Sequence, residues 1–310
     1  MISISSAAML GSINISVWEA RKQDRKTAEE VTISKGARSK RAATVQKHLF
    51  SECAALEAIK ALRGEVRTWF NTVTLPWDDN GRRLITTAQY LSVTAQAARY
   101  QQRFDDLVRV FLNTYSTEIS KQAFEMGALF DRTEYPPEDD VAHKFRFSFT
   151  VEPVSESGDF RVDIGLAAAA DLRDQYDKAM AERLNGAMAD AWRRVKEQVE
   201  WVRERMEAIM AYDPDAVEEI ENRDDDGNLV SIDIKKKRRP KLYDSMLEQG
   251  LSLTDLLKDL NVTNDPRLEE TRQQLEAALS RIDMDSLKES TELQQATKNA
   301  MQDILDRFAL

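Results

Sequence analysis

Cysteine, histidine, glycine and proline are all scarce in this chain of 310 residues. The single cysteine, Cys53, cannot form an intramolecular disulfide, which fits a reducing compartment and predicts a cytoplasmic location. With only 10 glycines and 7 prolines, few residues interrupt a helix. Alanine, glutamate, leucine and arginine are common, and they lose little conformational freedom in a helix. The composition therefore predicts a mainly α-helical protein.

Long hydrophobic runs and enzyme motifs are missing as well. No run approaches the ~20 apolar residues of a membrane-spanning helix, and residues 1–17 lack the basic start of a signal peptide, so we expect no membrane partner. No phosphate-binding glycine-rich loop, Gly-x-Ser-x-Gly or His-Glu-x-x-His motif is present. The histidines are His48 and His143. His48 and Cys53 lie about 140° apart on a predicted helix, which is a poor geometry for a catalytic dyad. We expect no enzyme, no catalytic residue and no cofactor.

Acidic clusters leave metal chemistry open only as a weaker alternative. Asp78 and Asp79 follow Trp77, and residues 138–140 are all acidic. These residues would suit a metal-dependent hydrolase, but paired acids in turns are more often solvated turn formers. Residues 224–228 lack the alternating acids of a calcium loop. We therefore predict no metal site.

Two basic segments stand out against a net charge of −10. Residues 21–47 contain nine bases and three acids, and residues 213–226 contain eight acids just before the second basic run. That run consists of Lys235, Lys236, Lys237, Arg238, Arg239 and Lys241. It could bind the phosphates of a nucleic acid such as DNA, or form a solvated hairpin edge balanced by the preceding acids. No interleaved aromatic residue supports base stacking there.

The first half of the chain predicts a mixed helical domain, residues 1–165. Apolar spacing indicates helices over about 37–63 and 87–130, with an extended piece at 67–74 and a tight turn at 75–81. Strict alternation at 145–151 and 159–164 predicts a β-hairpin over about 144–164, which packs on helices or pairs with the N-terminal region.

The second half, residues 166–310, predicts a long helical arm or bundle. Apolar residues recur every three or four positions over about 165–211, enough for a helix of ~70 Å. We expect a short helix at 247–260, and helices over 266–310 that return along the long helix and bury its stripe. Together they would form an antiparallel coiled-coil-like arm or bundle, with a charged insertion at about 213–241. Trp77, Trp192 and Trp201 are candidates for a partner surface, although core packing of the long helix's methionines and tryptophans is the commoner outcome.

Several short segments together resemble a known family. They are Trp18-Glu-Ala-Arg21, Thr74 to Leu84 with its Leu-Pro-Trp-Asp-Asp-Asn-Gly core, Gly127-Ala-Leu-Phe130, Tyr135-Pro136, Pro153 and Gly158-Asp-Phe-Arg-Val162. Over about residues 15–165 the chain resembles a family of phage and bacterial mobile-element proteins of unknown function, carried near MoxR-type ATPase genes. The resemblance implies a phage or prophage setting and an ATPase or DNA-processing partner, and it supplies no catalytic residues.

These observations favour a non-enzymatic assembly or adaptor protein. It would act by helical self-association, as a homo-oligomer, or by docking a protein partner. The alternative is a nucleic-acid-binding protein that uses residues 21–47 and 235–241. Steeply salt-dependent binding to DNA or RNA separates the second hypothesis from the first.

Overall fold

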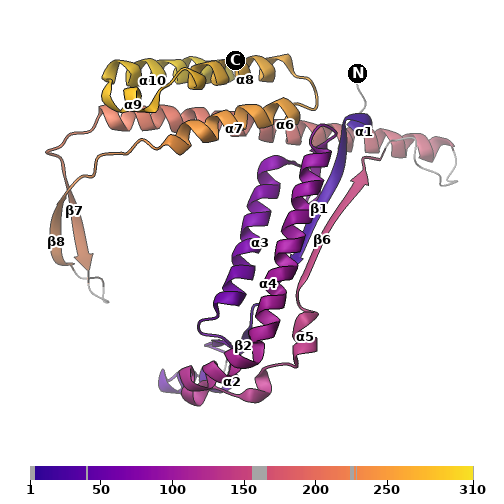
Figure 1. Cartoon of the computed structure of the whole chain (residues 1–310), viewed down its shortest axis with the longest axis vertical. Coiled ribbons are helices and arrows are strands. Elements are labelled where there is room, and N and C mark those ends of the chain that lie inside the picture. The colour runs from indigo at the N-terminus through magenta and orange to yellow at the C-terminus, as the bar shows by residue number, and fades with distance from the viewer. Residues whose placement is uncertain (1–3, 40, 156–165, 224–226, 228, 310) are drawn as a thin grey trace. The chain divides into compact units, whose positions relative to one another are not determined.

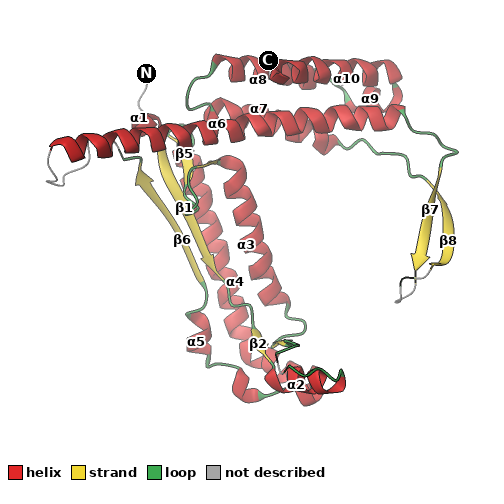
Figure 2. Ribbon diagram, turned by 180° about the vertical axis from the view of Figure 1, so that it is seen from behind, coloured by secondary structure: helices red, strands yellow, loops and turns green. Residues whose placement is uncertain are grey.

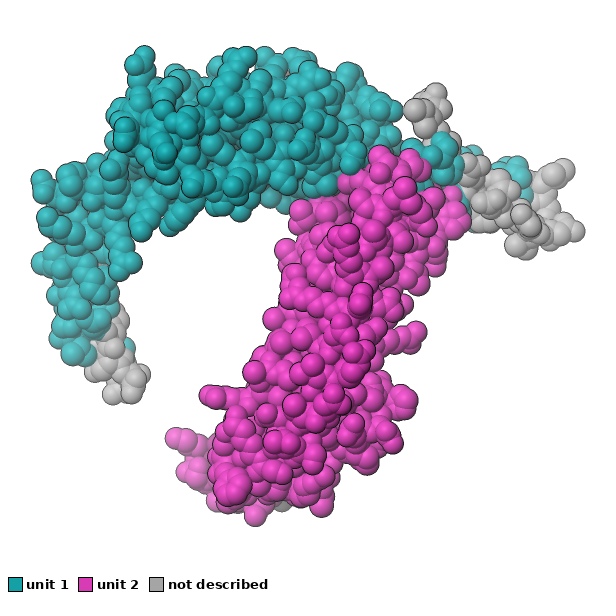
Figure 3. Space-filling model, viewed as in Figure 1, with its two compact units in different colours: residues 1–8, 75–77, 155–310 teal, residues 9–74, 78–154 magenta. Residues whose placement is uncertain are grey.

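The structure of the chain, a computed structural model, describes residues 4–39, 41–155, 166–223, 227 and 229–309. It is mainly helical with small antiparallel sheets, which confirms the predicted fold class at that level. Two compact units are distinguished in Figure 3. Unit 1 contains residues 1–8, 75–77 and 155–310, and unit 2 contains residues 9–74 and 78–154. No helix of the described residues is both long enough and apolar enough to cross a membrane.

Unit 2 is organised around two packed helices, α3 and α4 (Figure 1). Its helices are α2 (Arg25–Ser34), α3 (Ala54–Val73), α4 (Tyr90–Glu125) and α5 (Glu138–Ala142), with 3-10 turns at Gly127–Leu129 and Arg132–Glu134. The prediction of an extended segment at 67–74 was wrong. The helix runs through Gly64, whose α-carbon faces open space, because the buried spacing of Leu62, Val66 and Phe70 continues to the helix end.

A small antiparallel sheet covers these helices. In unit 2 its strands follow the order β5 (Arg83–Thr86), β1 (Ala8–Ser16), β6 (Arg146–Pro153). β1 pairs with β6 so that Ile13 lies opposite Phe149 and Ile15 opposite Phe147. The alternation at 145–151 therefore does mark a strand, and its partner is the N-terminal region. The second half of the predicted hairpin, residues 159–164, lies outside the described residues.

Three further strands in the described first half of the chain are short. β2 (Arg21–Gln23) pairs with β3 (Gln46–His48), which places the two ends of the basic segment 21–47 side by side. β4 (Leu75–Pro76) belongs to unit 1, where it contacts α6, and α1 (Ile4–Ala7) belongs to the same unit.

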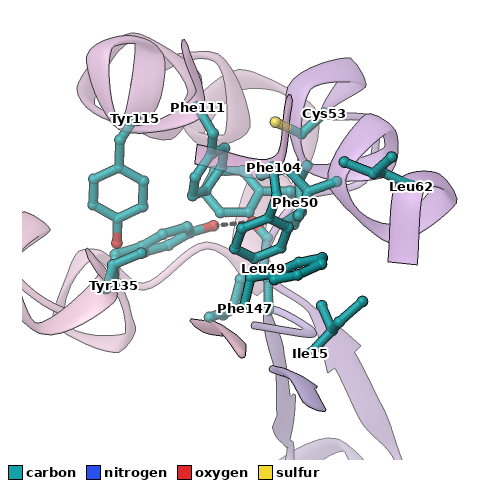
Figure 4. Packing of buried hydrophobic residues seen from close by; sticks show 14 of the residues in the cluster. Ile15, Leu49, Phe50, Cys53, Leu62, Phe104, Phe111, Tyr115, Tyr135 and Phe147 are labelled. Carbon is teal, nitrogen blue, oxygen red and sulfur yellow. Dashed lines mark hydrogen bonds between the residues drawn. The ribbon is translucent and has the colours of Figure 1, made fainter. Parts of the chain in front are cut away.

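Aromatic rings fill the core of unit 2 (Figure 4). The Phe50 ring packs edge-on against Phe111 and Tyr135, with centroids 6.1 and 5.6 Å away. The Tyr135 hydroxyl donates to the carbonyl oxygen of Leu49 at 2.5 Å, and the Tyr115 hydroxyl donates to that of Pro136 at 2.9 Å. Burial raises the pKa of both tyrosines to about 12. The two hydroxyls therefore stay protonated and hold the loops around α5 to the core.

Unit 1 is a helical bundle built on one long helix. Its helices are α6 (Leu166–Met210), α7 (Asp244–Leu260), α8 (Pro266–Ser280), α9 (Met284–Glu289) and α10 (Thr291–Asp306), followed by a 3-10 turn at Arg307–Ala309. α10 packs along α6, and α7 packs on α8. The predicted extent of α6 is confirmed. As predicted, a helix from residues 266–310 packs along α6, and the α6 stripe at Val195, Val199, Val202 and Met206 is buried. A long coiled-coil arm is not confirmed.

The charged insertion forms a two-stranded ribbon. β7 (Val217–Arg223) pairs antiparallel with β8 (Leu229–Lys236), as Figure 2 shows. All eight residues of β8 are exposed. The basic run 235–241 begins at the end of β8 and continues into the loop that leads to α7.

Candidate functional site

A hollow at the foot of this ribbon gathers the second basic run. Its volume is about 670 Å³. Its lining consists of Ile209, Tyr212, Lys236, Lys237, Arg238, Arg239, Pro240, Lys241, Leu242 and Lys288. We call these residues the basic hollow. Five of the six predicted bases take part. The sixth, Lys235, lies in a smaller neighbouring depression of about 460 Å³ with Glu218 and Ile220.

Hydrogen bonds from the end of α6 hold the basic loop in place. The Arg205 Nε donates to the carbonyl oxygen of Lys241 at 2.8 Å, and its Nη2 donates to the same oxygen. The Arg205 guanidinium also lies 5.8 Å from the centre of the Tyr243 ring. The Tyr212 hydroxyl donates to the carbonyl oxygen of Lys237 at 3.3 Å. The loop backbone is thus bound at both ends, while its charged side chains remain exposed.

Apolar side chains form the wall behind these cations. Ile209 is buried, and Tyr212, Pro240 and Leu242 are half-buried. Since Tyr212 has its hydroxyl bound to the loop, it acts as part of the wall rather than as a free stacking platform. The basic hollow is therefore an apolar depression with a cationic rim.

The charges of the rim are not matched by acids within the hollow. No carboxylate is among its lining residues. In the ribbon register Glu218 lies opposite Lys235, whereas Val217 lies opposite Lys236. Residues 237–241 extend past β7 altogether. Among side chains that the structure describes, none of the five bases from the run has a carboxylate within ion-pair distance. The described acids that precede the run therefore make no ion pair with these five bases, although Glu218 lines the neighbouring depression together with Lys236, Lys237 and Arg238.

Lys288 is the exception among the lining cations. It comes from α9, and its Nζ lies 3.3 Å from Asp285 and 3.5 Å from Asp244. The hydrogen bond that Lys288 donates to Asp285 raises the pKa of Lys288 above its ordinary value. Lys288 therefore remains charged, but part of its field is offset by two exposed carboxylates.

The first basic segment, 21–47, does not form a comparable site. Lys47 has a nearly buried amine that pairs with Glu134 and donates to the carbonyl oxygen of Leu129 at 2.8 Å. Lys22 also lies 3.7 Å from Glu134. These two lysines join the strand pair β2–β3 to the turn before α5. Arg25, Lys26 and other bases of the segment are exposed, and Lys40 lies outside the described residues.

The three candidate tryptophans lie in different surroundings. Trp77 is 4% exposed, which leaves its ring almost no surface for a partner. The half-buried Trp192 ring packs edge-on against Phe308 at 5.3 Å, and its Nε1 donates to Asp265 at 3.3 Å. Trp201 is 39% exposed on α6. Of the three, Trp201 presents the most surface to a partner.

The acids beside Trp77 form a closed turn. Asp78 accepts from the backbone amides of Asn80 and Arg82 at 3.0 and 3.1 Å and from Arg82 Nε at 2.6 Å. Burial alone would raise the pKa of Asp78, but these hydrogen bonds hold it below its usual value. Asp79 is exposed. Within the described residues, no group of three or more histidine, cysteine or acidic side chains has a geometry that could hold a metal ion.

Cys53 and His48 also lie in different local structures from those expected. The predicted helix at 37–63 begins only at Ala54, so His48 belongs to β3 and Cys53 is the N-cap residue of α3. Cys53 is buried, and desolvation raises the pKa of its thiol, whereas His48 is exposed. Because the thiol is buried and the imidazole is exposed, this arrangement does not support a role for the two residues as nucleophile and base.

Searches of family models, curated proteins and solved structures return no match for this chain. The candidate site therefore depends on its own geometry. Sequence reasoning identified its basic residues but missed Arg205, Tyr212 and Lys288. The first two sit within or just after the long periodic helix, where they look like ordinary surface residues. Lys288 lies 47 residues beyond Lys241, and no local pattern connects the two.

Proposed function

We propose that this chain is a non-enzymatic binding protein that holds the phosphate backbone of nucleic acid in the basic hollow. The observation that carries the proposal is the clustering of exposed lysines and arginines around one depression that no acid lines. Each cation that contacts a phosphate releases a condensed counterion, which is the main source of affinity in such complexes.

The chemistry of the rim favours backbone contacts over base reading. Phosphate contacts position a protein on a duplex without reading its sequence. Sequence reading needs side chains that reach base edges from a helix or ribbon in a groove. The ribbon itself carries Glu218 and Glu221 on β7, and these acids would repel the phosphates on either side of a groove. We therefore expect binding to duplex DNA with little dependence on sequence.

A titration of a labelled duplex of about 20 base pairs into the full-length protein tests this proposal by fluorescence anisotropy. If all five bases of the run contact phosphate, the slope of log K against log salt is about −4.5, so affinity falls roughly 500-fold between 50 and 200 mM salt. The triple variant Arg238→Gln, Arg239→Gln, Lys241→Gln should reduce the slope to about −1.8, and the same change of salt should then cost only about 10-fold.

The matched control is Arg25→Gln, Lys26→Gln, Arg38→Gln. It removes the same charge from exposed positions outside the hollow. A loss of slope equal to that of the first variant would show a general charge effect and would refute the assignment of the site. Binding that persists at about 0.5 M salt would refute a phosphate-driven mode.

The resemblance to phage and mobile-element proteins is compatible with this proposal, since it implies a DNA-processing setting or an ATPase partner. An adaptor that self-associates or docks a protein partner is the second candidate function. The apolar stripe of the long helix is buried by α10, α7 and α8 of the same chain, so such an adaptor would act through its other surfaces.

A further inference from the structure

The β7–β8 ribbon exposes more apolar surface than an isolated ribbon is expected to tolerate. Val230 and Ile234 are each 67% exposed, and Val217, Leu229 and Ile232 are exposed as well. Two strands without a covering layer are marginally stable in water. Within the described chain the sheet consists of β7 and β8 alone, so the outer edge of β8 has no strand beside it.

The register of the ribbon leaves Asp233 on β8 without a charged residue opposite it. Residues directly opposite in an antiparallel pair share a face, so Glu218 and Lys235 lie together on the face that also carries Ile220 and Asp233. Lys235 thus has an acid across from it, but Asp233 lies opposite Ile220. Asp233 is exposed and, among the described side chains, has no cation within ion-pair distance.

We propose that the outer edge of β8 pairs antiparallel with β8 of a second copy of this chain, with the two-fold axis at Ile234. This register places Asp233 of each copy opposite Lys235 of the other. The row then alternates in charge across three strands, from Glu218 through Lys235 to the second copy's Asp233, and ends at the second copy's Ile220. The Asp233 carboxylate of each copy thus gains Lys235 of the other copy as its cation. This pair forms twice in the dimer, once on each side of the axis.

The opposite face is completed by the same register. Ile234 meets Ile234 of the second copy, and Ile232 lies opposite Lys236, whose aliphatic stem can cover it. Moving the two-fold axis by one residue, to Asp233 or to Lys235, still places residues of the same face opposite each other. These two registers are less stable, because each sets that charged residue opposite its own copy. Charge complementarity therefore selects a second copy and a particular alignment. The pairing goes beyond the proposed function and does not depend on nucleic-acid binding.

Exchange of the two charges tests the pairing. Sedimentation equilibrium of the full chain should show a dimer. Asp233→Lys alone sets the new lysine of each copy opposite Lys235 of the other. It should raise the dissociation constant of the dimer about tenfold or more. The triple variant Glu218→Lys, Asp233→Lys, Lys235→Asp restores opposite charges across the axis and keeps them across the β7–β8 pair, so it should recover dimerisation. A monomer at all concentrations up to about 0.1 mM, or a triple variant no better than the single one, would overturn the proposal.

Cysteine cross-linking tests the register independently. Directly opposite Cα atoms in antiparallel strands are about 4.5 to 5.5 Å apart, which suits a disulfide. Ile234→Cys should therefore form a covalent dimer under mild oxidation. Val230→Cys is the matched control on the same strand with the same exposure, and it should not. The only native cysteine, Cys53, is buried and adds little background. Equal cross-linking of both variants, or none at 234, would contradict the alignment.

Discussion

Gly11 allows β1 to pack closely on the rest of unit 2, so Gly11→Ala should destabilise the protein in a way that one further substitution relieves. A Cβ at position 11 would lie 2.3 Å from Ile85 Cδ1, 3.1 Å from Ile85 Cγ1 and 3.3 Å from Phe70 Cζ. Ile85 is fully buried and Phe70 is buried, so neither side chain can swing into solvent. Overpacking of this kind costs about 2 kcal/mol.

Removal of the nearest obstructing atom should reverse most of that cost. Ile85→Val deletes Cδ1 and by itself costs about 1 kcal/mol. In the Ile85→Val background, the added methyl of Gly11→Ala fills the vacated space. The double variant should therefore be about as stable as Ile85→Val alone, whereas independent effects would sum to about 3 kcal/mol. The coupling energy should be about 2 kcal/mol.

Hydrogen exchange followed by mass spectrometry measures this coupling. The opening free energy of peptides from β1 and β6 reports on unit 2 alone. Peptides from α8 and α10 serve as the internal control and should not change. Additive losses in the double variant would show that Ile85 is not the obstacle, and would refute the close-packing argument for Gly11.

Two further predictions concern the bundle and its basic loop. Arg205→Lys keeps the charge but loses the forked donation to the Lys241 carbonyl, so duplex affinity should fall roughly three- to tenfold in the anisotropy assay; unchanged affinity would show that the loop needs no such anchor. Hydrogen bonds from Arg272 lower the pKa of Glu269 from 4.5 to about 2. Its contribution to stability is therefore present above pH 4.5 and is lost as the pH falls toward 2. Urea unfolding should show Glu269→Gln less stable than the original at pH 7 and equal to it near pH 2; a constant difference would contradict this linkage.

The sequence was sufficient for features that depend on local periodicity. The 45 residues of α6 could be outlined from apolar spacing, because a helix buries one face every three or four residues. Alternation at 145–151 identified β6 for the corresponding reason. The capping pair at Asp265-Pro266 also marks the start of α8, where the Asp265 carboxylate accepts from the Arg267 amide at 2.9 Å.

Local sequence pattern did not predict secondary structure correctly where contacts with distant parts of the chain determine it. Residues 8–16 show weak periodicity but form β1, because they complete a sheet with β6 about 140 residues later. Gly64 would weaken an isolated helix, yet α3 continues through it because Val66 and Phe70 are buried against the rest of unit 2.

The candidate site likewise has features that the sequence revealed and features that only the tertiary structure determined. Its lysines and arginines are a contiguous run, so their charge was visible in the sequence. The sequence did not show whether acids neutralise that charge, because this depends on the β7–β8 register and on how far the run extends past β7. The anchor at Arg205 and the cation at Lys288 come from helices far away along the chain. Electrostatic and packing energies depend on distances in space, and only the tertiary structure determines those distances.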